Sequence, residues 1–406
     1  MFSIYILFAL IAKLIASPEP SIQRSGQYVP ELAAVDVEVS SFMEKWQIPG
    51  ASIAFVKDGK LIYARGFGKA DEGKSVEPYH SLFRIASLSK PVTAIAIMKL
   101  VQEGKLSLDD KVFGKRGILN EAAYSDIRDD RIKNITLKHL LEHSAGWDRD
   151  MSACGDPMFD PVNIARAMNT KAPADARTII RFMLRQKLDF SPGQKFAYSN
   201  LGYTILGRVI EKVSGKEYEK YVQSAILNPA GIHGMKLGKN GYEQKEVNEV
   251  RYYSDKQATS VCEPGKEVSC QYGGFNIEAM DAHGGWIASA TDLAKLLTAV
   301  DGFPNKKDLL SDESMEAIST PSEVYPHHYS LGWFVNKKGN WWHSGCLEGA
   351  SSMMARIHNG MGWVMLFNSN PMSGKYYAEM DKLMWKAIAN VSTWPAHDLS
   401  TNESKL

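Results

Sequence analysis

Hydrophobic and polar positions along the chain predict strands near both ends and helices between them. Residues 51–68 form two β-rich runs around Asp58-Gly59, a dipeptide typical of tight hairpin turns. Similar runs recur in the last third of the chain, and His358-Asn359-Gly360 separates the final two. These runs are 329–335, 340–345, 351–357 and 362–368. The pattern predicts an antiparallel sheet whose strands come from both ends of the chain.

Other segments have apolar residues every three to four positions, which predicts amphipathic helices. In the segment 84–104, Pro91 falls in the first turn, where a missing N–H costs little. Ser289 stands three residues before Asp292, as at a capped helix start. The predicted helices are 32–46, 84–104, 178–186, 203–213, 218–227, 288–300 and 376–389. Strands are scarce between 106 and 272.

The order of these elements predicts an α+β fold. We expect an antiparallel sheet built from N- and C-terminal strands, flanked by helices, with a mostly helical lobe inserted. The expected bounds are about 30–105 and 280–392 for the α/β part and about 106–279 for the lobe. Together they form one domain over 18–395, and 396–406 is expected to be a disordered tail.

Composition and charge narrow the classes of partner. Hydrophobic residues make up 44% of the 406 residues and charged residues 23%, as in ordinary globular proteins. Lys plus Arg number 47 against 46 for Asp plus Glu, and no long basic or acidic run occurs. Neither nucleic acid nor an anionic membrane surface is therefore expected as a partner. A small molecule or a peptide bound at a local site fits better.

The N-terminal segment resembles a targeting signal. An apolar run over 1–12 is too short to cross a bilayer, and small residues precede Pro18. We expect a signal peptide at 1–17 and a secreted or extracytoplasmic protein with no stable membrane span after processing. Lys13 interrupts the run and no Lys or Arg precedes it, so a signal anchor stays an alternative.

Three sequons agree with a secreted eukaryotic chain, although such tripeptides also arise by chance. They make Asn134, Asn390 and Asn402 candidates for glycosylation.

Four cysteines permit three complete pairings in an oxidising compartment. Cys262 and Cys270 flank a Pro-Gly turn, which makes them the first candidate for a disulfide. Four free thiols are the alternative.

The segment 84–104 contains a candidate nucleophile. Ser87 stands three residues before Lys90, the only serine in the chain with a lysine at that spacing. Residues three apart share a helix face, so the amine can reach the hydroxyl. A serine hydroxyl needs such a base to become a nucleophile. The alternative is an ordinary helix-capping serine beside a solvated lysine.

Two further motifs follow in order: Tyr198-Ser199-Asn200, and His343-Ser344-Gly345 at the end of a predicted strand. With Ser87-x-x-Lys90, they resemble the serine β-lactamase and penicillin-binding-protein superfamily. The resemblance is to the branch of class C β-lactamases, D-Ala-D-Ala carboxypeptidases, related esterases and animal β-lactamase-like proteins. Further phrases extend it over most of 32–389: "FRIASLSK", "LKHLLEHSAGW", "GGWIASATDLAKLL" and "YSLGWF".

The resemblance implies a β-lactamase-type fold and a role for each motif residue. Ser87 would be acylated, Lys90 would take its proton, and Tyr198 would share the base role and pass a proton to the leaving group. Asn200 would bind the substrate amide. The backbone N–H groups of Ser87 and Cys346 would form the oxyanion hole. Ser344 and Gly345 would contribute to substrate binding beside them.

The chain departs from the family pattern at two positions. His343 stands where most β-lactamases have a lysine that holds the antibiotic's carboxylate, and histidine is mostly neutral at pH 7. Esterase or peptidase activity is therefore expected ahead of β-lactamase activity. Cys346 replaces a small residue, and its thiol either narrows the pocket or pairs with Cys154. The resemblance implies no metal or organic cofactor.

Two rival functions use the same chain. His139, Glu142 and His143 have the H-x-x-E-H spacing of an inverted zinc protease, although Ser144-Ala145-Gly146 ends that helix at once. A non-catalytic scaffold or structural protein with the same fold is the other alternative. The sequence favours a serine hydrolase that forms an acyl-enzyme with an ester or amide. It leaves the oligomeric state unknown.

Overall fold

The structure is a computed structural model that describes residues 22–152, 155–326 and 328–400. The expected signal peptide at 1–17 lies outside the described residues, as do Cys154 and Asn402.

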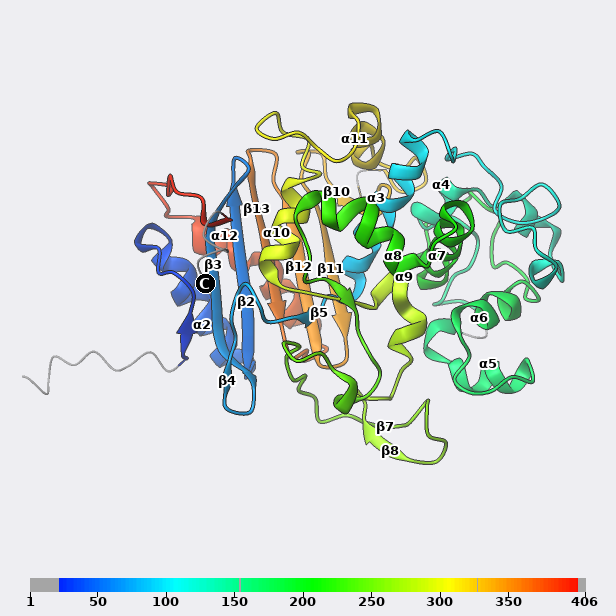
Figure 1. Ribbon diagram of the computed structural model, residues 1–406, viewed down its shortest axis with the longest axis horizontal. Coiled ribbons are helices and arrows are strands. Elements are labelled where there is room, and N and C mark those ends of the chain that lie inside the picture. Colours follow the sequence, from blue (N-terminus) through cyan, green and yellow to red (C-terminus); the bar gives the residue numbers. More distant parts are fainter. Residues whose placement is uncertain (1–21, 153–154, 327, 401–406) are drawn as a thin grey trace, which may run out of the picture.

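One antiparallel sheet contains strands from both ends of the chain (Figure 1). Its order is β1-β3-β2-β13-β12-β11-β10, and β4 pairs with β3. Asp58 and Gly59 both have positive φ and form the predicted turn between β2 and β3. The strands of this sheet are β1 (Arg24–Ser25), β2 (Gly50–Lys57), β3 (Lys60–Asp71), β4 (Lys74–Ser75), β10 (Phe334–Val335), β11 (Trp341–Leu347), β12 (Ala350–Arg356) and β13 (Met361–Phe367).

Helices cover both faces of the sheet and fill the lobe beside it. They are α2 (Ala33–Trp46), α3 (Ser89–Gln102), α4 (Leu137–Leu141), α5 (Pro161–Ala167), α6 (Ala176–Met183), α7 (Asn200–Ser214), α8 (Tyr218–Val222), α9 (Asp281–Gly284), α10 (Ala290–Thr298), α11 (Asp312–Ser319) and α12 (Gly374–Ile388). The lobe, on the right in Figure 1, contains α4 to α8. The predicted α+β fold with an inserted, mostly helical lobe is thus confirmed.

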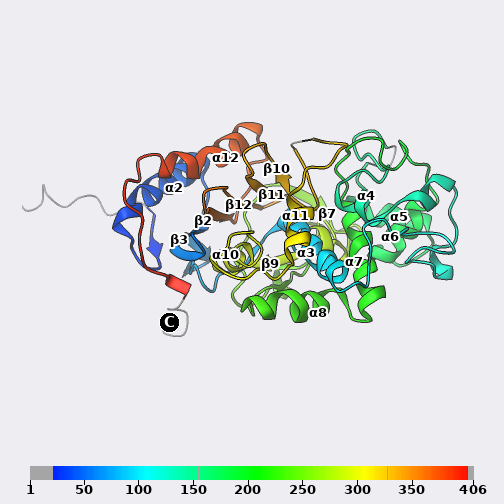
Figure 2. The same cartoon turned by 90° about the horizontal axis from the view of Figure 1, so that it is seen from above.

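Successive side chains of the central strands point to opposite faces of the sheet, and both sets are apolar, which explains why helices cover both faces. In β2, Ile53 and Phe55 belong to an apolar core shared with α2 and α12. Ala54 and Val56 point the other way, into a larger core that includes α10, α3 and the lobe. Figure 2 shows the sheet between α2 and α12 on one side and α10 on the other.

A small sheet joins the lobe to the body through the pairing of β9 (Trp286–Ala288) with β6 (Lys236–Leu237). β5 (Phe83–Arg84), just before the candidate nucleophile, pairs with β9 in the same sheet. β7 (Gln257–Thr259) and β8 (Glu267–Ser269) form a separate hairpin. Because β5 pairs with β9 and the Arg84 N–H donates to the Tyr252 hydroxyl at 2.7 Å, the segment that follows β5 starts from a fixed position.

The structure corrects the predicted disulfide. Cys262 and Cys270 are free thiols. The β7–β8 register explains this, since the N–H of Cys270 donates to the Lys256 carbonyl at 2.8 Å, at the far end of the hairpin from the loop that carries Cys262.

Two smaller predictions were also wrong in part. Of 329–335, only Phe334–Val335 is a strand, because the Ser330 N–H bonds the Trp333 carbonyl in a tight turn and Gly332 has a φ of +88°. Residues 396–400 of the expected disordered tail contact β3, where the N–H of Leu61 donates to Asp398 at 3.2 Å.

Surface positions leave the glycosylation prediction in place. Asn134 and Asn390 are both exposed. Within the described ranges, none of the helices has the length and apolar character needed to cross a bilayer.

Candidate active site

Ser87 lies on a 3-10 turn, η2 (Ala86–Leu88), that connects β5 to α3. Ala86 has a φ of +48°, a left-handed conformation that a non-glycine residue adopts at a cost. Lys90 follows in the first turn of α3, and its Nζ lies 3.1 Å from Ser87 Oγ. The predicted pair therefore meets, as the three-residue spacing requires.

Lys90 has two further partners, both hydrogen-bond acceptors. Its Nζ donates to Asn200 Oδ1 at 2.8 Å and to the carbonyl oxygen of His283 at 3.0 Å. A neutral amine has two hydrogens and one lone pair. With both hydrogens given to these acceptors, the lone pair of the neutral form points at the remaining partner, the hydroxyl of Ser87.

The surroundings of Lys90 favour this neutral form. The side chain is fully buried, and burial lowers its pKa well below the usual value. Asp156 raises the pKa of Lys90 and Arg149 lowers it, each by a smaller amount. Lys90 thus meets the electrostatic requirement for a general base.

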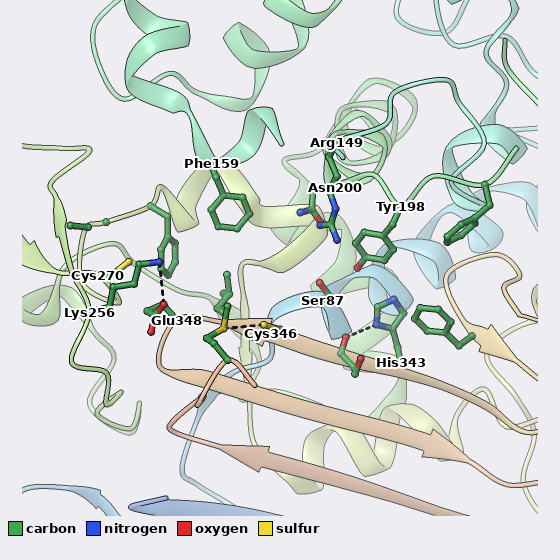
Figure 3. A pocket seen from close by; sticks show the side chains of 18 residues that line it. Ser87, Arg149, Phe159, Tyr198, Asn200, Lys256, Cys270, His343, Cys346 and Glu348 are labelled. Atoms are coloured by element: carbon green, nitrogen blue, oxygen red, sulfur yellow. Dashed lines mark hydrogen bonds and ion pairs between the residues drawn. The ribbon is translucent and has the colours of Figure 1, made fainter. Parts of the chain in front are cut away.

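Tyr198 stands opposite Lys90, immediately before the N-cap of α7. Lys90 Nζ lies 4.7 Å from the centroid of its ring, and the ring of His143 packs against it at 4.3 Å. Figure 3 shows the phenol pointing toward Ser87. Burial raises the pKa of Tyr198, against the opposing effect of a hydrogen bond with Ser87, so the phenol stays protonated at neutral pH.

Asn200 is held in one orientation by two charged side chains that the sequence did not single out. Its Nδ2 donates to Asp156 Oδ2 at 2.6 Å, and Arg149 lies 3.6 Å from the same oxygen. Arg149 also lies over the ring of Tyr198, at 4.9 Å. Since Nδ2 has two hydrogens, one remains for a substrate.

His343 belongs to a chain of buried hydrogen bonds whose directions can be deduced. The carbonyl of Ser344 can only accept, so His343 Nδ1 donates to it at 2.7 Å and Nε2 accepts from the hydroxyl of Tyr329 at 3.3 Å. The N–H of Ser199 donates to His143 Nδ1 at 3.1 Å, which leaves His143 Nε2 to donate to Tyr329 at 3.1 Å. Tyr329 thus bridges two neutral histidines.

His143 and His343, the two histidines that Tyr329 bridges, both stay neutral. Burial, then the nearby charge of Lys90, lowers the pKa of His343 to about 3. The same two causes hold the pKa of His143 well below its usual value. With both ring nitrogens engaged inside the protein, His343 supports β11 and has no N–H to offer a substrate carboxylate.

β11 brings the third motif against the nucleophile turn. A Cβ at position 345 would collide with the Ile85 carbonyl and with Ser352 Oγ, so only glycine allows this approach. Ser344 and Cys346 line the same cavity as Ser87. The oxyanion role of the Ser87 and Cys346 amides stays a prediction.

A cavity of about 720 Å³ opens over Ser87 (Figure 3). The predicted residues that line it are Ser87, Tyr198, Asn200, His343, Ser344 and Cys346. Others were not foreseen, because nothing in the local pattern distinguishes them: Arg149, Phe159, Phe196, Lys256, Cys270, Phe275, Phe334, Leu347, Glu348 and Met372. Lys90 lies beneath this surface.

The zinc-protease alternative does not match the structure. His139 Nδ1 accepts from the N–H of Thr136 in a capping box, and Glu142 accepts from the Ser144 hydroxyl at 2.8 Å. His143 is committed to the chain described above. Across the part of the chain that the structure describes, no three His, Cys, Asp or Glu side chains are grouped to hold a metal ion.

Comparisons with known proteins bear on the family and the fold of this chain. A family model described as Beta-lactamase matches residues 35–383. Protein flp of Staphylococcus aureus (strain COL) is 28% identical over 341 residues, 83% of this chain and 63% of that protein. The chain thus spans less than two thirds of this relative's length.

Solved structures share the fold. The penicillin-binding protein homologue from Pyrococcus abyssi, described as octameric, is 26% identical with a TM-score of 0.66, covering 87% of this chain and 77% of that one. The D-amino acid amidase from Ochrobactrum anthropi SV3, solved with D-phenylalanine, is 21% identical with a TM-score of 0.66, covering 89% and 99%. At that identity the amidase shows the fold alone.

Proposed function

We propose, from the premise that this chain belongs to the Beta-lactamase family, that it is a serine hydrolase that cleaves esters or amides through an acyl-enzyme. One observation carries the proposal. The buried amine of Lys90 lies 3.1 Å from Ser87 Oγ with its other contacts made to acceptors, and Ser87 lines an open cavity. A helix-capping serine beside a solvated lysine would not have this arrangement.

The chemistry follows from the groups around Ser87. Neutral Lys90 accepts the hydroxyl proton as the oxygen of Ser87 bonds to the substrate carbonyl carbon. The protonated phenol of Tyr198 donates to the leaving oxygen or nitrogen as that bond breaks, and Lys90 restores the proton of Tyr198. Water then gives a proton to the same groups as its oxygen bonds to the acyl carbon, the bond from that carbon to Ser87 Oγ breaks, and the proton returns to Oγ as the acid leaves.

Two further groups assist in this scheme. The free hydrogen of Asn200 Nδ2 orients the substrate. The backbone N–H groups of Ser87 and Cys346 stabilise the developing oxyanion, and each such donor contributes about 3 kcal/mol in comparable sites.

A fluorophosphonate probe tests the function. The folded protein should be labelled at Ser87, and Ser87→Ala should abolish labelling and lower kcat on a nitrophenyl ester on the order of a million-fold. Ser89→Ala is the matched control, because its hydroxyl accepts from the Trp286 N–H outside the cavity. Folded wild-type protein that resists the probe would refute the proposal.

Turnover rates on three substrates test which activity is strongest. We expect fastest turnover of a nitrophenyl ester, then a D-amino-acid peptide, and slowest turnover of a chromogenic cephalosporin, because neutral His343 cannot anchor the cephalosporin carboxylate. Fast cephalosporin hydrolysis would contradict this order.

A further inference from the structure

The cavity continues past Ser87 into an apolar compartment that the proposed chemistry does not use. The wall of this compartment is backed by a small apolar cluster separate from the two main cores: Ala86, Cys270, Phe275, Ile277, Met280 and Leu347. Cys270, Phe275 and Leu347 of this cluster line the cavity, whereas Ala86, which directly precedes the nucleophile, is buried behind it. Apolar side chains therefore form part of the wall of the cavity that Ser87 lines.

Phe159, from the lobe, adds an exposed aromatic ring to this compartment. Its centroid lies 6.2 Å from that of Phe275, and the residue is 49% exposed. Figure 3 shows it on the opposite side of Ser87 from His343. A large exposed aromatic side chain at the mouth of a cavity gains free energy when a ligand covers it.

The charges around the cavity are already paired. Among the described residues that line it, Arg149 lies 3.6 Å from Asp156, and Lys256 lies 3.7 Å from Glu348. His343 is neutral, with both nitrogens engaged. A carboxylate on the substrate would have to compete with Asp156 for Arg149 or with Glu348 for Lys256.

The position of Tyr198 decides which part of the substrate lies in the compartment. Its phenol donates to the leaving group, so the leaving group lies on the side of Tyr198. The acyl group then extends the other way, past Cys346 toward Phe159 (Figure 3).

We propose that the site selects esters or amides with a bulky, apolar, uncharged acyl group, held between Phe159, Phe275 and Leu347. This inference rests on the proposed serine hydrolase function and deepens it by assigning the acyl side of the substrate.

A chain-length series tests the proposal. With nitrophenyl acetate, butyrate and hexanoate, kcat/KM should rise about fourfold for each added methylene that is buried. The nitrophenyl monoester of succinate, with a terminal carboxylate, should react about tenfold or more slowly than the butyrate.

The variant Phe159→Ala tests whether this ring causes the preference for longer acyl chains. The ratio of kcat/KM for hexanoate to that for acetate should fall about fivefold, because the longer chain loses the ring it covers. Tyr28→Ala is the matched control: Tyr28 is 57% exposed and lies over Arg65 of β3, outside the cavity. The Tyr28→Ala variant should have the same ratio as the wild type. Because Phe159 is half exposed, Phe159→Ala is expected to leave the fold intact.

The outcomes separate this inference from the proposed function. A flat chain-length series, a succinate monoester as fast as the butyrate, or an unchanged ratio in Phe159→Ala would overturn the acyl selectivity while Ser87 was still labelled by fluorophosphonate. Absence of labelling would instead overturn the function itself.

Discussion

The charge of Lys90 depends on two neighbours of opposite sign. Asp156 favours the ammonium form and Arg149 opposes it, and burial lowers the pKa of Lys90 by more than either neighbour changes it. Only the neutral amine can accept the proton of Ser87. Activity should therefore be present above the pKa of Lys90 and be lost as the pH falls through it.

Substitutions at these two neighbours should move the acidic limb of kcat/KM in opposite directions. Asp156→Asn keeps an oxygen to accept from Asn200 Nδ2 but removes the negative charge, so the limb should move to lower pH. Arg149→Gln removes the positive charge and should move it to higher pH. Profiles of kcat/KM against pH measure both shifts, and shifts of the same sign would exclude Lys90 as the titrating base.

Tyr329 should act as a positioning residue through its two histidines. Tyr329→Phe keeps the ring but leaves His143 Nε2 and His343 Nε2 without their buried partner. We expect a loss of about 1–3 kcal/mol in the free energy of unfolding, measured with urea. Tyr325→Phe, in a half-buried ring stacked on Phe196, is the control and should change the free energy of unfolding little.

Nitrogen NMR reports which ring nitrogens carry hydrogens, and a general loss of stability would not change that assignment. In the wild type, Nδ1 of His343 and Nε2 of His143 should carry the hydrogens, and the phenylalanine variant should disturb both assignments. Opposite tautomers in the wild type would disprove the deduced chain.

The positions of individual side chains were predictable where the spacing along one helix determines which residues can meet. Ser87 and Lys90 are one helical turn apart, and Tyr198 and Asn200 flank a helix start, so their neighbourhoods follow from sequence. Arg149 and Asp156 reach the site through contacts with residues more than forty positions away. Nothing in their local pattern records that.

Helix α7 links stability to the site through its first residues. Ser199 caps it by accepting from the Gly202 N–H at 3.2 Å, between Tyr198 and Asn200. Ser199→Ala should cost about 1 kcal/mol in the free energy of unfolding and should also lower kcat, because both flanking side chains lose their fixed position.

Ser289→Ala offers the matched comparison. Ser289 caps α10 by accepting from the Asp292 N–H at 3.0 Å and does not line the cavity. It should lose a similar amount of stability with kcat unchanged, as thermal melts and steady-state rates would show. Equal losses of kcat in both variants would mean that the cap of α7 has no special role.

Elements with strong periodicity matched their predictions more closely than the short ones. α2 begins and ends within one residue of the expected 32–46, because its apolar spacing continues to Trp46. Residues 329–335 have strand composition, yet most of them turn, since Tyr329 reaches inward to two histidines from distant segments. Tertiary contacts prevailed over composition there.

At the scale of the whole molecule, the candidate site lies where the body and the lobe meet. Ser87 and Lys90 come from the junction of β5 and α3, Tyr198 and Asn200 from the lobe, and His343 from the C-terminal sheet strand. The sequence indicated this order of motifs and the inserted lobe. It did not indicate the walls of the cavity, because most of the additional lining residues come from loops and short elements without periodicity.

Phe159 ends a short 3-10 turn and Phe275 lies in a loop, and neither segment supplies a group of the proposed reaction. Libraries randomised at these two positions could therefore retune which acids the catalyst releases while the proton-transfer apparatus stays constant. Directed evolution on this scaffold would begin there, with turnover of the smallest ester serving to confirm that the chemistry has survived.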